Sequence, residues 1–288
     1  MILDIIAEAT RGRVERAKRK LPQEKLKDKI YEGGVLGNFH GRGAFAFERA
    51  LDKRNLRKEK NRLISFICEI KKASPSKGVI AEDFPYLRIA QEYVSAGADA
   101  ISVLTEPEHF QGEDRYLTEI SREVPLPVLR KDFIIDEYQI YEAKLIGADA
   151  VLLICSLLDT AVIRDYLRLC SELGMSALVE AHSEEEIYSA VESGARIIGV
   201  NNRNLKTFEV NLQNSIRLRS LVPQNIIFVA ESGIQSPEDV ATLRAAGVDA
   251  VLIGETLMRS KNKKEELDRL RYGDKKEIDC SSVSGAEL

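Results

Sequence analysis

Four apolar segments along the chain open in the same way. They read GADAISV from Gly97, GADAVLL from Gly147, GARIIGV from Gly194 and GVDAVLI from Gly247. Each glycine follows a helical pattern, where a left-handed residue commonly ends the helix, and each is followed by a short apolar strand. The glycines are separated by 50, 47 and 53 residues, which is more than one strand and one helix require.

Four further apolar runs alternate with these segments: ISFICEI, PVLRKDF, SALVEAH and IIFVAES. Each is followed by its own helical pattern, such as that from Glu137 to Ile146. The repeat therefore holds two strand–helix units, and four repeats predict eight. Nearly continuous apolar strands that alternate with helices are typical of a parallel sheet closed into a barrel. An open doubly wound sheet is the alternative, but no glycine-rich dinucleotide motif follows the first strand.

The predicted fold class is therefore α/β, a single (β/α)8 TIM barrel with an N-terminal helical extension. The extension covers residues 1–45 and has helical patterns at 3–20 and 23–33. It could close one end of the barrel as a plug or cover the other end as a lid, and the sequence leaves both open. We assign the barrel to residues 46–272, and the polar, aperiodic tail at 273–288 is predicted to be disordered.

Composition and charge narrow the functional classes. The 288 residues suit one barrel with additions, which typically takes about 250 residues. The net charge of −4 gives no general attraction to nucleic acid or anionic membranes, and no apolar run is long enough to span a bilayer. Four cysteines without paired spacing favour a reducing cytoplasm. His40, His109 and His182 show no metal-site spacing, so we expect no bound metal.

Charged and polar residues gather at the predicted carboxyl ends of the strands. In such barrels these ends and the following loops carry the catalytic groups. Glu69 and Lys71 lie two apart and so share one face of an extended strand. Other strands add Lys131, Glu180, Asn201, Arg203 and Glu231. Each one alone is ordinary for a solvated turn, but together they predict a pocket in which lysines and carboxylates tune one another's pKa values for proton transfer.

The loops after the seventh and eighth predicted strands suggest a phosphate site. In ESGIQSPED, Ser232 and Gly233 form a tight turn ahead of a helix whose N-cap is Ser236. In LIGETLM, Gly254 opens the backbone and Glu255 begins the next helix. Either loop alone would also suit an ordinary strand-to-helix turn. In many barrels, however, these two loops together bind a phosphate through backbone N–H groups.

Six longer strings carry a resemblance to a known family: EIKKASPSKG, SVLTEPEHFQG, VLRKDFIID, LVEAH, IGVNNRNLKTF and VAESGI. In their order along the chain they resemble the indole-3-glycerol phosphate synthases of tryptophan biosynthesis, from the N-terminal helices to about residue 260. The resemblance implies a (β/α)8 barrel enzyme without a cofactor. It also implies the substrate 1-(2-carboxyphenylamino)-1-deoxyribulose 5-phosphate, whose ring closure, decarboxylation and dehydration give indole-3-glycerol phosphate.

The resemblance assigns catalytic roles to five positions. It makes Lys131 the general acid that protonates the ketone during ring closure. Glu180 and Glu69 are implied as the acid–base pair of the dehydration, with their division of labour left open. Lys71 is implied to hold anionic groups of the substrate, and Asn201 to orient the substrate in the middle of the pocket.

The resemblance also implies the residues that bind the substrate. Those expected to contact its organic part are Ser74, Phe110, Phe133, Arg203 and Glu231, the first three as walls around the anthranilate ring. Those expected around its phosphate are Lys71, Ser232, Gly233, Gly254 and Glu255. Glu255 departs from the family, where a hydroxyl often stands, because a carboxylate would repel a phosphate. We therefore expect its side chain to turn away and its backbone N–H to contribute.

The same site residues allow two other functions. One is phosphoribosylanthranilate isomerase, a neighbouring pathway enzyme on the same fold. The Cys–Asp pair of that family is missing, since Cys68 precedes Glu69 and faces the other side of its strand. The other is a barrel that binds a phosphorylated metabolite without catalysis, against which the acid–base set argues. The expected partners are a small phosphorylated substrate and, by the resemblance, other tryptophan-pathway enzymes.

Overall fold

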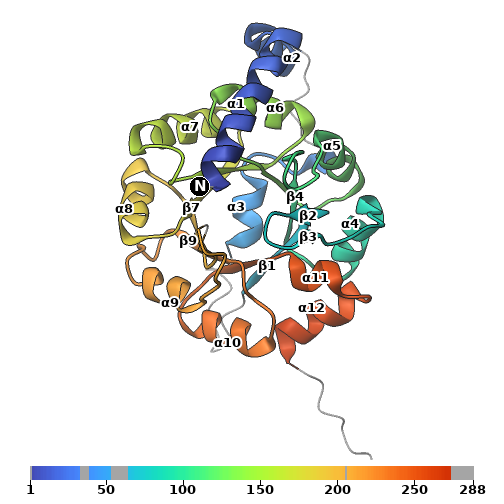
Figure 1. Cartoon of the computed structure of the whole chain (residues 1–288), viewed down its shortest axis with the longest axis vertical. Coiled ribbons are helices and arrows are strands. Elements are labelled where there is room, and N and C mark those ends of the chain that lie inside the picture. Colours follow the sequence, from blue (N-terminus) through green and yellow to red (C-terminus); the bar gives the residue numbers. More distant parts are fainter. Residues whose placement is uncertain (1, 33–38, 53–63, 205, 274–288) are drawn as a thin grey trace, which may run out of the picture.

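A closed ring of eight parallel strands forms the centre of the molecule, seen end-on in Figure 1. The computed structural model describes residues 2–32, 39–52, 64–204 and 206–273. The strands of the ring pair in the order β1-β10-β9-β8-β7-β6-β5-β4. They are β1 (Ser65–Ile70), β4 (Ala100–Leu104), β5 (Val128–Lys131), β6 (Ala150–Ile154), β7 (Ser176–Ala181), β8 (Ile197–Asn201), β9 (Ile227–Glu231) and β10 (Ala250–Ile253). The predicted (β/α)8 barrel is confirmed.

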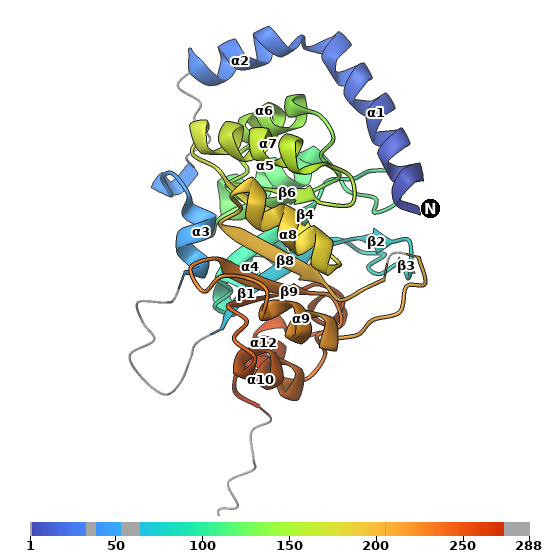
Figure 2. The same cartoon turned by 90° about the vertical axis from the view of Figure 1, so that its left-hand side faces the viewer.

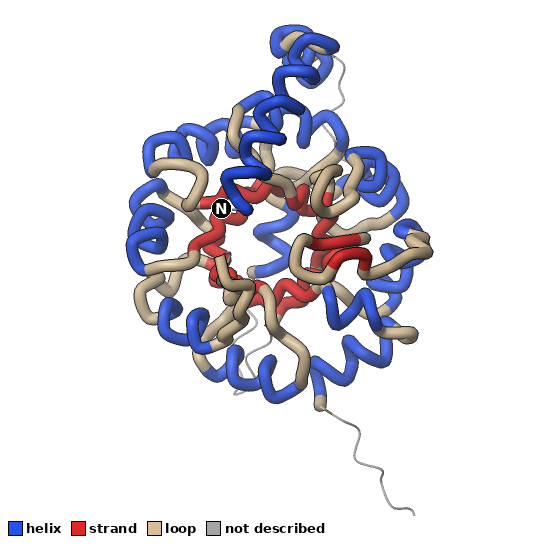
Figure 3. Tube along the Cα trace, viewed as in Figure 1, coloured by secondary structure: helices blue, strands red, loops and turns tan. Residues whose placement is uncertain are grey.

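Helices surround the ring and cover its outer face, as Figure 3 shows. They are α4 (Tyr86–Ser95), α5 (Asp114–Glu123), α6 (Glu137–Ile146), α7 (Thr160–Glu172), α8 (Glu184–Ser193), α9 (Gln213–Arg219), α10 (Pro237–Ala245), α11 (Glu255–Arg259) and α12 (Lys263–Tyr272). A short antiparallel pair, β2 (Ala73–Ser74) and β3 (Gly78–Val79), lies in the loop after β1. This loop belongs to the carboxyl end of the barrel, where the site is expected.

Alternation along each strand divides the apolar core into two layers. On β1, Phe66, Cys68 and Ile70 belong to the layer between strands and helices, whereas Ile67 belongs to the barrel interior. Glu69 follows Ile67 on the inward face, because side chains two apart on a strand point the same way. Cys68 therefore faces away from the barrel mouth, as the sequence predicted.

The repeated glycines and aspartates serve the joints between helices and strands. Gly97, Gly147, Gly194 and Gly247 all have positive φ angles, between 79° and 95°, as predicted for helix ends. In three of the repeats an aspartate follows two residues later and accepts a backbone N–H from the start of the preceding strand. The bonds are Phe66 N to Asp99 (2.8 Å), Val128 N to Asp149 (2.9 Å) and Phe228 N to Asp249 (2.9 Å). In these three repeats the aspartate thus helps to align two neighbouring strands.

Helices that precede β1 lie at both ends of the barrel. Helix α1 (Ile2–Lys20) runs across the carboxyl-end mouth and α2 (Gln23–Tyr31) continues beyond it, while α3 (Ala46–Leu51) lies at the opposite end (Figure 2). The sequence predicted α1 and α2 but not α3. This helix lies within the residues assigned to the barrel, ahead of its first strand, β1. A helix of six residues is too short to show a clear period. The tail predicted to be disordered, residues 273–288, lies outside the described part of the chain from residue 274 on.

Helix α3 is a plug for the amino end of the barrel. Its Phe47 and Leu51 are fully buried and join the interior cluster formed by inward residues of the strands, such as Ile67 and Leu129. Without this helix, the lowest interior side chains would meet water. We infer that α3 contributes stability and leaves the chemistry to the other end.

We expect Phe47→Ala to lower the free energy of unfolding by about 3–5 kcal/mol, the usual cost of deleting a fully buried phenylalanine side chain. Urea unfolding followed by circular dichroism measures the change. Tyr188→Ala is the matched control, because this aromatic side chain on α8 is 56% exposed and should change stability little. Equal stability of the two variants would contradict the plug.

Candidate active site

A cavity of about 330 Å³ opens at the carboxyl end of the barrel. The structure brings all the sequence-predicted site residues to this one cavity. They are Glu69, Lys71, Ser74, Phe110, Lys131, Phe133, Glu180, Asn201, Arg203, Glu231, Ser232, Gly233, Gly254 and Glu255. Their chemical roles stay predictions, but their common location follows from the parallel ring of strands.

The centre of the cavity is the ammonium group of Lys131, at the end of β5. Its Nζ lies 3.3 Å from Glu180 Oε2 on β7 and 3.2 Å from Glu231 Oε2 on β9. Glu69 on β1 is likewise buried. These four side chains come from alternate strands of the ring, as one layer of inward side chains does in such barrels. The charged cluster is therefore the uppermost layer of the barrel's own packing.

Glu180 and Glu231 share the charge of Lys131, and the pKa values of the three groups reflect this. Burial alone would lower the pKa of Lys131, but Glu231, Glu180 and Glu69 raise it above its ordinary value. Burial raises the pKa of Glu231 to about 7, and the neighbouring Glu180 adds to the rise. Burial acts on Glu180 in the same direction, yet Lys131 and His182 hold its pKa below the ordinary value. At neutral pH the site thus holds an ammonium, an ionised Glu180 and a half-protonated Glu231.

Two glycines make room for the carboxylates. A Cβ atom at Gly199 on β8 would lie 2.2 Å from Glu231 Oε1, and one at Gly254 would lie 2.2 Å from Glu69 Oε1 and 3.2 Å from Lys71 Nζ. The Glu69 carboxylate accepts a hydrogen bond from Lys71 Nζ. Gly254 therefore lets the pair of Glu69 and Lys71 stand directly beside the loop that was predicted to bind phosphate.

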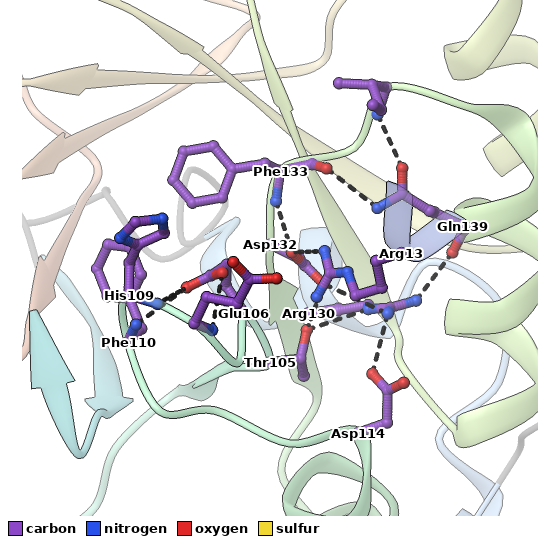
Figure 4. A network of polar contacts seen from close by, with 12 residues as sticks. Arg13, Thr105, Glu106, His109, Phe110, Asp114, Arg130, Asp132, Phe133 and Gln139 are labelled. Atoms are coloured by element: carbon purple, nitrogen blue, oxygen red, sulfur yellow. Dashed lines mark hydrogen bonds and ion pairs between the residues drawn. The ribbon is translucent and has the colours of Figure 1, made fainter. Parts of the chain in front are cut away.

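The aromatic wall of the cavity is held from behind by buried polar groups (Figure 4). The rings of Phe110 and Phe133 pack against each other, tilted by 39°, with centroids 6.0 Å apart. Glu106, which is 2% exposed, accepts backbone N–H groups from Glu108, His109 and Phe110 at 2.7–3.0 Å. A carboxylate with three such donors fixes a loop firmly. The sequence analysis missed Glu106, although its place just after a strand was a usable signal.

The two predicted phosphate loops have the backbone shapes that the sequence suggested. Ser232 and Gly233 have φ angles of 67° and 84°, and Ser236 caps α10 through a reciprocal pair with Asp239. The positive φ of Ser232 is unusual for a residue with a side chain and marks a constrained turn. Asn202, which the sequence analysis did not single out, supports this turn by donating to the carbonyl oxygens of Glu231 and Ser232.

Glu255, the departure from the family pattern, has its carboxylate engaged by cations. Its Oε1 lies 3.4 Å from Lys77 Nζ and 3.1 Å from Arg259 Nε. Burial raises the pKa of Glu255, but Arg259 and Lys77 together bring it below the ordinary value. An ionised carboxylate that is paired with two cations repels an anion less than a free one would.

Asn201 and Arg203 follow β8 and lie between the cavity and the next loop. The Asn201 side chain hydrogen-bonds Glu180, and its Oδ1 accepts the backbone N–H of Arg203 at 3.0 Å. The Arg203 guanidinium donates to the carbonyl oxygen of Phe208 at 3.2 Å. Asn201 thus contacts the acid–base cluster directly, while Arg203 stabilises the loop that follows β8.

Helix α1 covers the cavity from above, which the sequence left undecided. Ile2, Leu3 and Ile6 line the cavity. The helix is anchored by Arg13, whose Nη2 lies 2.6 Å from Asp132 Oδ1, and by Lys18, which lies 2.6 Å from Asp136 Oδ2. Of the two roles left open for the extension, α1 therefore has that of the lid, while the plug is α3, which follows residues 1–45.

The anchor of the lid is part of a larger ionic network beside Lys131 (Figure 4). Asp132 also accepts from Thr105 at 2.8 Å and from the backbone of Phe133 at 2.8 Å, and it lies 3.3 Å from Arg130. Burial raises the pKa of Asp132, but Arg13 and Arg130 hold it below the ordinary value. Because Asp132 follows Lys131 directly, this network ties the lid to the backbone that carries the central lysine.

Comparison with known proteins agrees with this geometry. A barrel with an acid–base cluster and two glycine-containing loops at its carboxyl end defines a (β/α)8-barrel enzyme for a small phosphorylated substrate. The family model of indole-3-glycerol phosphate synthase matches residues 3–270. The chain belongs to this family.

Relatives and solved structures of other proteins match the same region. Indole-3-glycerol phosphate synthases from Ruminiclostridium cellulolyticum and Lachnoclostridium phytofermentans are 56% and 51% identical, each over 94% of this chain and 99% of the relative. The 3-hexulose-6-phosphate synthase of Salmonella typhimurium shares only the fold, with a TM-score of 0.59 and 16% identity over 72% of this chain and 97% of that one. No helix in the described ranges combines the length and apolar character needed to cross a membrane.

The raised pKa of Glu231 predicts a pH-dependent stability. A carboxyl group whose pKa rises from 4.5 to about 7 on folding stabilises the fold while it is protonated, below its unfolded pKa. This contribution is lost as the pH rises through the folded value. In Glu231→Gln, which keeps the shape without the charge, that loss should be absent. The difference in unfolding free energy should therefore shift in favour of the variant between pH 4.5 and about 7.

Equilibrium urea unfolding at several pH values measures this difference. Glu172→Gln, at the exposed end of α7, is the control and should follow the wild type at every pH. A constant difference between Glu231→Gln and the wild type across the range would show that Glu231 is not protonated in the folded state.

Proposed function

We propose that the cluster around Lys131 carries out the reaction of the family to which the chain belongs. That activity is the synthesis of indole-3-glycerol phosphate from 1-(2-carboxyphenylamino)-1-deoxyribulose 5-phosphate, a carboxy-lyase reaction of tryptophan biosynthesis. The observation that carries the proposal is the buried ammonium of Lys131 between Glu180 and Glu231 in the covered mouth of the barrel. A solvated turn has no need for such a cluster.

Ring closure is the first step and needs a proton donor. The aromatic carbon that bears the carboxylate attacks the ketone carbon, and the carbonyl oxygen takes up a proton. Lys131 is the donor. Its raised pKa keeps the ammonium protonated until the substrate arrives, and its burial lets it act without competition from water.

Carbon dioxide leaves in the second step. The attack on the ketone turns the ring nitrogen into an iminium group, and the carboxylate lies β to it. The electrons of the breaking C–C bond flow to the iminium and restore the aromatic ring. The intermediate supplies its own electron sink, a task that a cofactor performs in other decarboxylases.

Dehydration is the third step and needs an acid and a base. The hydroxyl group leaves as water after it accepts a proton, and the neighbouring ring carbon loses a proton. Glu180 is the base, because its lowered pKa keeps it ionised beside Lys131. Glu69, with Lys71 hydrogen-bonded to it, assists the departure of the hydroxyl group.

The remaining cavity residues hold the substrate. Phe110 and Phe133, whose rings pack against each other, form a wall against the anthranilate ring together with Ser74. The phosphate binds the backbone N–H groups of Ser232, Gly233, Gly254 and Glu255 and the ammonium of Lys71. Support for this comes from the Lys71 ammonium, which lies beside Gly254. Asn201 and Arg203 orient the middle of the substrate, and Glu231 lies beside the reacting carbons.

A cytoplasmic location and contacts with other tryptophan-pathway enzymes belong to this proposal as well. The basis for both is the biosynthetic reaction, whose substrate and product are small phosphorylated metabolites. Co-elution of the chain with the other enzymes of the pathway from a cell extract tests the contacts.

Lys131→Ala should lower turnover roughly 10²- to 10⁴-fold, since a positioned proton donor typically contributes that much. The appearance of indole fluorescence at saturating substrate measures turnover, and circular dichroism checks that the variant is folded. Lys264→Ala, at an exposed site on α12, is the control. Near-normal turnover of Lys131→Ala would show that Lys131 is not the general acid. A wild-type chain that binds the substrate without forming product would favour the non-catalytic barrel.

Glu69 and Lys71 share one face yet should respond differently to substitution. Lys71→Met should raise KM as well as lower turnover, because Lys71 meets an anionic group in the ground state. Glu69→Gln should lower turnover with KM nearly constant, because Glu69 acts on a proton after ring closure. Steady-state kinetics of both variants separate these effects. If Glu69→Gln unfolds the protein but leaves the folded fraction fully active, the pair is a structural salt bridge.

A further inference from the structure

His182 lies between the active-site cavity and a second cavity. It directly follows β7, and its side chain is 17% exposed. The second cavity, of about 500 Å³, is lined by His182 and by polar residues of α8, the loop after β8 and α9, among them Glu186, Asn202, Lys206 and Asn214. Glu180 lines the first cavity and His182 the second, so the imidazole stands where the two spaces approach each other.

The two ring nitrogens of His182 face two different carboxylates. Nε2 lies 3.4 Å from Glu180 Oε1, on the side of the active site. Nδ1 lies 3.2 Å from Glu186 Oε2, which also accepts the backbone N–H of His182 at 2.7 Å. Within the described residues, Nε2 is buried and has no hydrogen-bond partner. The ring is therefore fixed on its Glu186 side, while its other nitrogen points to the proposed base.

Glu180 continues the chain of groups toward the general acid. Its Oε1 faces His182, and its Oε2 lies 3.3 Å from Lys131 Nζ. The second cavity, His182, Glu180 and Lys131 thus follow one another across the barrel wall, with 3.4 Å between His182 Nε2 and Glu180 Oε1. The neighbouring contact of Asn201 with Glu180 holds the carboxylate in this bridging position.

The charges around His182 favour its protonated form. Glu180 and Glu231 face it from the strands, Glu186 from α8, and Arg203, Lys206 and Glu209 lie across the second cavity on the loop after β8. Lys131 is separated from it by Glu180. Burial alone would lower the pKa of His182, but the hydrogen bond to Glu186 and the charge of Glu180 raise it. These neighbours therefore favour the protonated ring, which has a proton to give at Nε2.

The proposed reaction needs a supply of protons. Two protons are placed on the ketone oxygen, first when the ring closes and then when this oxygen leaves as water. One proton is removed from the ring carbon. The substrate enters with a carboxylate and loses it as neutral carbon dioxide, so each turnover consumes one proton from solvent. The active site must take up that proton while the lid of α1 and the bound substrate cover its mouth.

We propose that His182 is a proton relay that restores this proton to the active site from the solvent of the second cavity. The inference rests on the proposed roles of Lys131 and Glu180. After Lys131 has given its proton to the substrate, the Nε2 proton of the imidazolium passes to Glu180 and from there to the Lys131 amine, so that Glu180 is ionised again before it takes the proton of the ring carbon. That ring-carbon proton replaces the one given to the departing hydroxyl group, and His182 supplies the one proton that each turnover consumes. The neutral imidazole then takes up a proton from water in the second cavity, with Glu186 holding the ring.

A relay affects repeated turnover more than the first turnover. The free enzyme already holds a protonated Lys131, so His182→Ala should close and decarboxylate the first substrate molecule at close to the wild-type rate in a rapid-quench experiment with enzyme in excess. Steady-state turnover should fall at least about tenfold, as expected for the loss of a proton-transfer group. Added imidazole should restore it, because the second cavity is open to small molecules.

The pH profile provides a second measurement of the same variant. Wild-type turnover should decline as the pH rises through the pKa of His182, since the neutral ring has no proton to give, and His182→Ala should lack this limb. His182→Asn, which keeps a polar side chain, serves if the alanine variant is unstable. His40→Gln is the control, since His40 contacts the carbonyl oxygen of Arg122 far from the site, and it should behave as the wild type.

The outcomes separate the relay from the function on which it rests. If both rates fall together and imidazole restores neither, His182 only positions Glu180 and the relay is wrong. If neither rate changes in a chain whose Lys131→Ala variant is inactive, the relay is also wrong, although the proposed function stands. If Lys131→Ala and Glu180→Gln keep full activity, the proposed function itself fails, whatever His182 does.

Discussion

The buried charge of Lys131 is the constraint on which the rest of the site depends. Three carboxylates of the same barrel layer surround it, and removing carboxylates from water is costly unless a cation lies close. The four groups come from alternate strands and point toward the barrel axis, so the carboxylates lie near the ammonium that offsets this cost. Because the two carboxyl groups share one ammonium, the pKa of Glu180 is lowered and that of Glu231 is raised. Acid–base chemistry requires such a difference between two pKa values.

Everything around this cluster supports the position or the protonation of the central lysine. Gly199 and Gly254 provide the space for two of the carboxylates. The Asp132 network fixes the backbone next to Lys131 and, through Arg13, the helix that covers the cavity. At the far end, α3 closes the barrel with apolar side chains. Stability and chemistry are thus placed at opposite ends of one ring, as is usual for this fold.

Much of the fold and of the candidate site could be predicted from the sequence. The repeat that begins at Gly97 fixed the number of strands, because each glycine ends a helix and each following run is buried on both faces. The spacing of Glu69 and Lys71 predicted their shared face, and the structure pairs them. Site residues were found where a polar side chain interrupts or ends an apolar strand. Glu106 and Asn202 follow strands just as closely, but polar residues are common in loops, so their position alone does not tell that they support the backbone of a loop.

The sequence by itself determined the ring of strands, the inward face of each strand and the set of polar residues that gather at one end. These features follow from local periodicity and from the parallel order of the strands. Only the tertiary structure decided that α1 is a lid and α3 a plug, and that His182 lies between Glu180 and a second cavity. Such relations depend on packing between segments far apart in the chain, such as Arg13 with Asp132, and no local pattern encodes the distance between them.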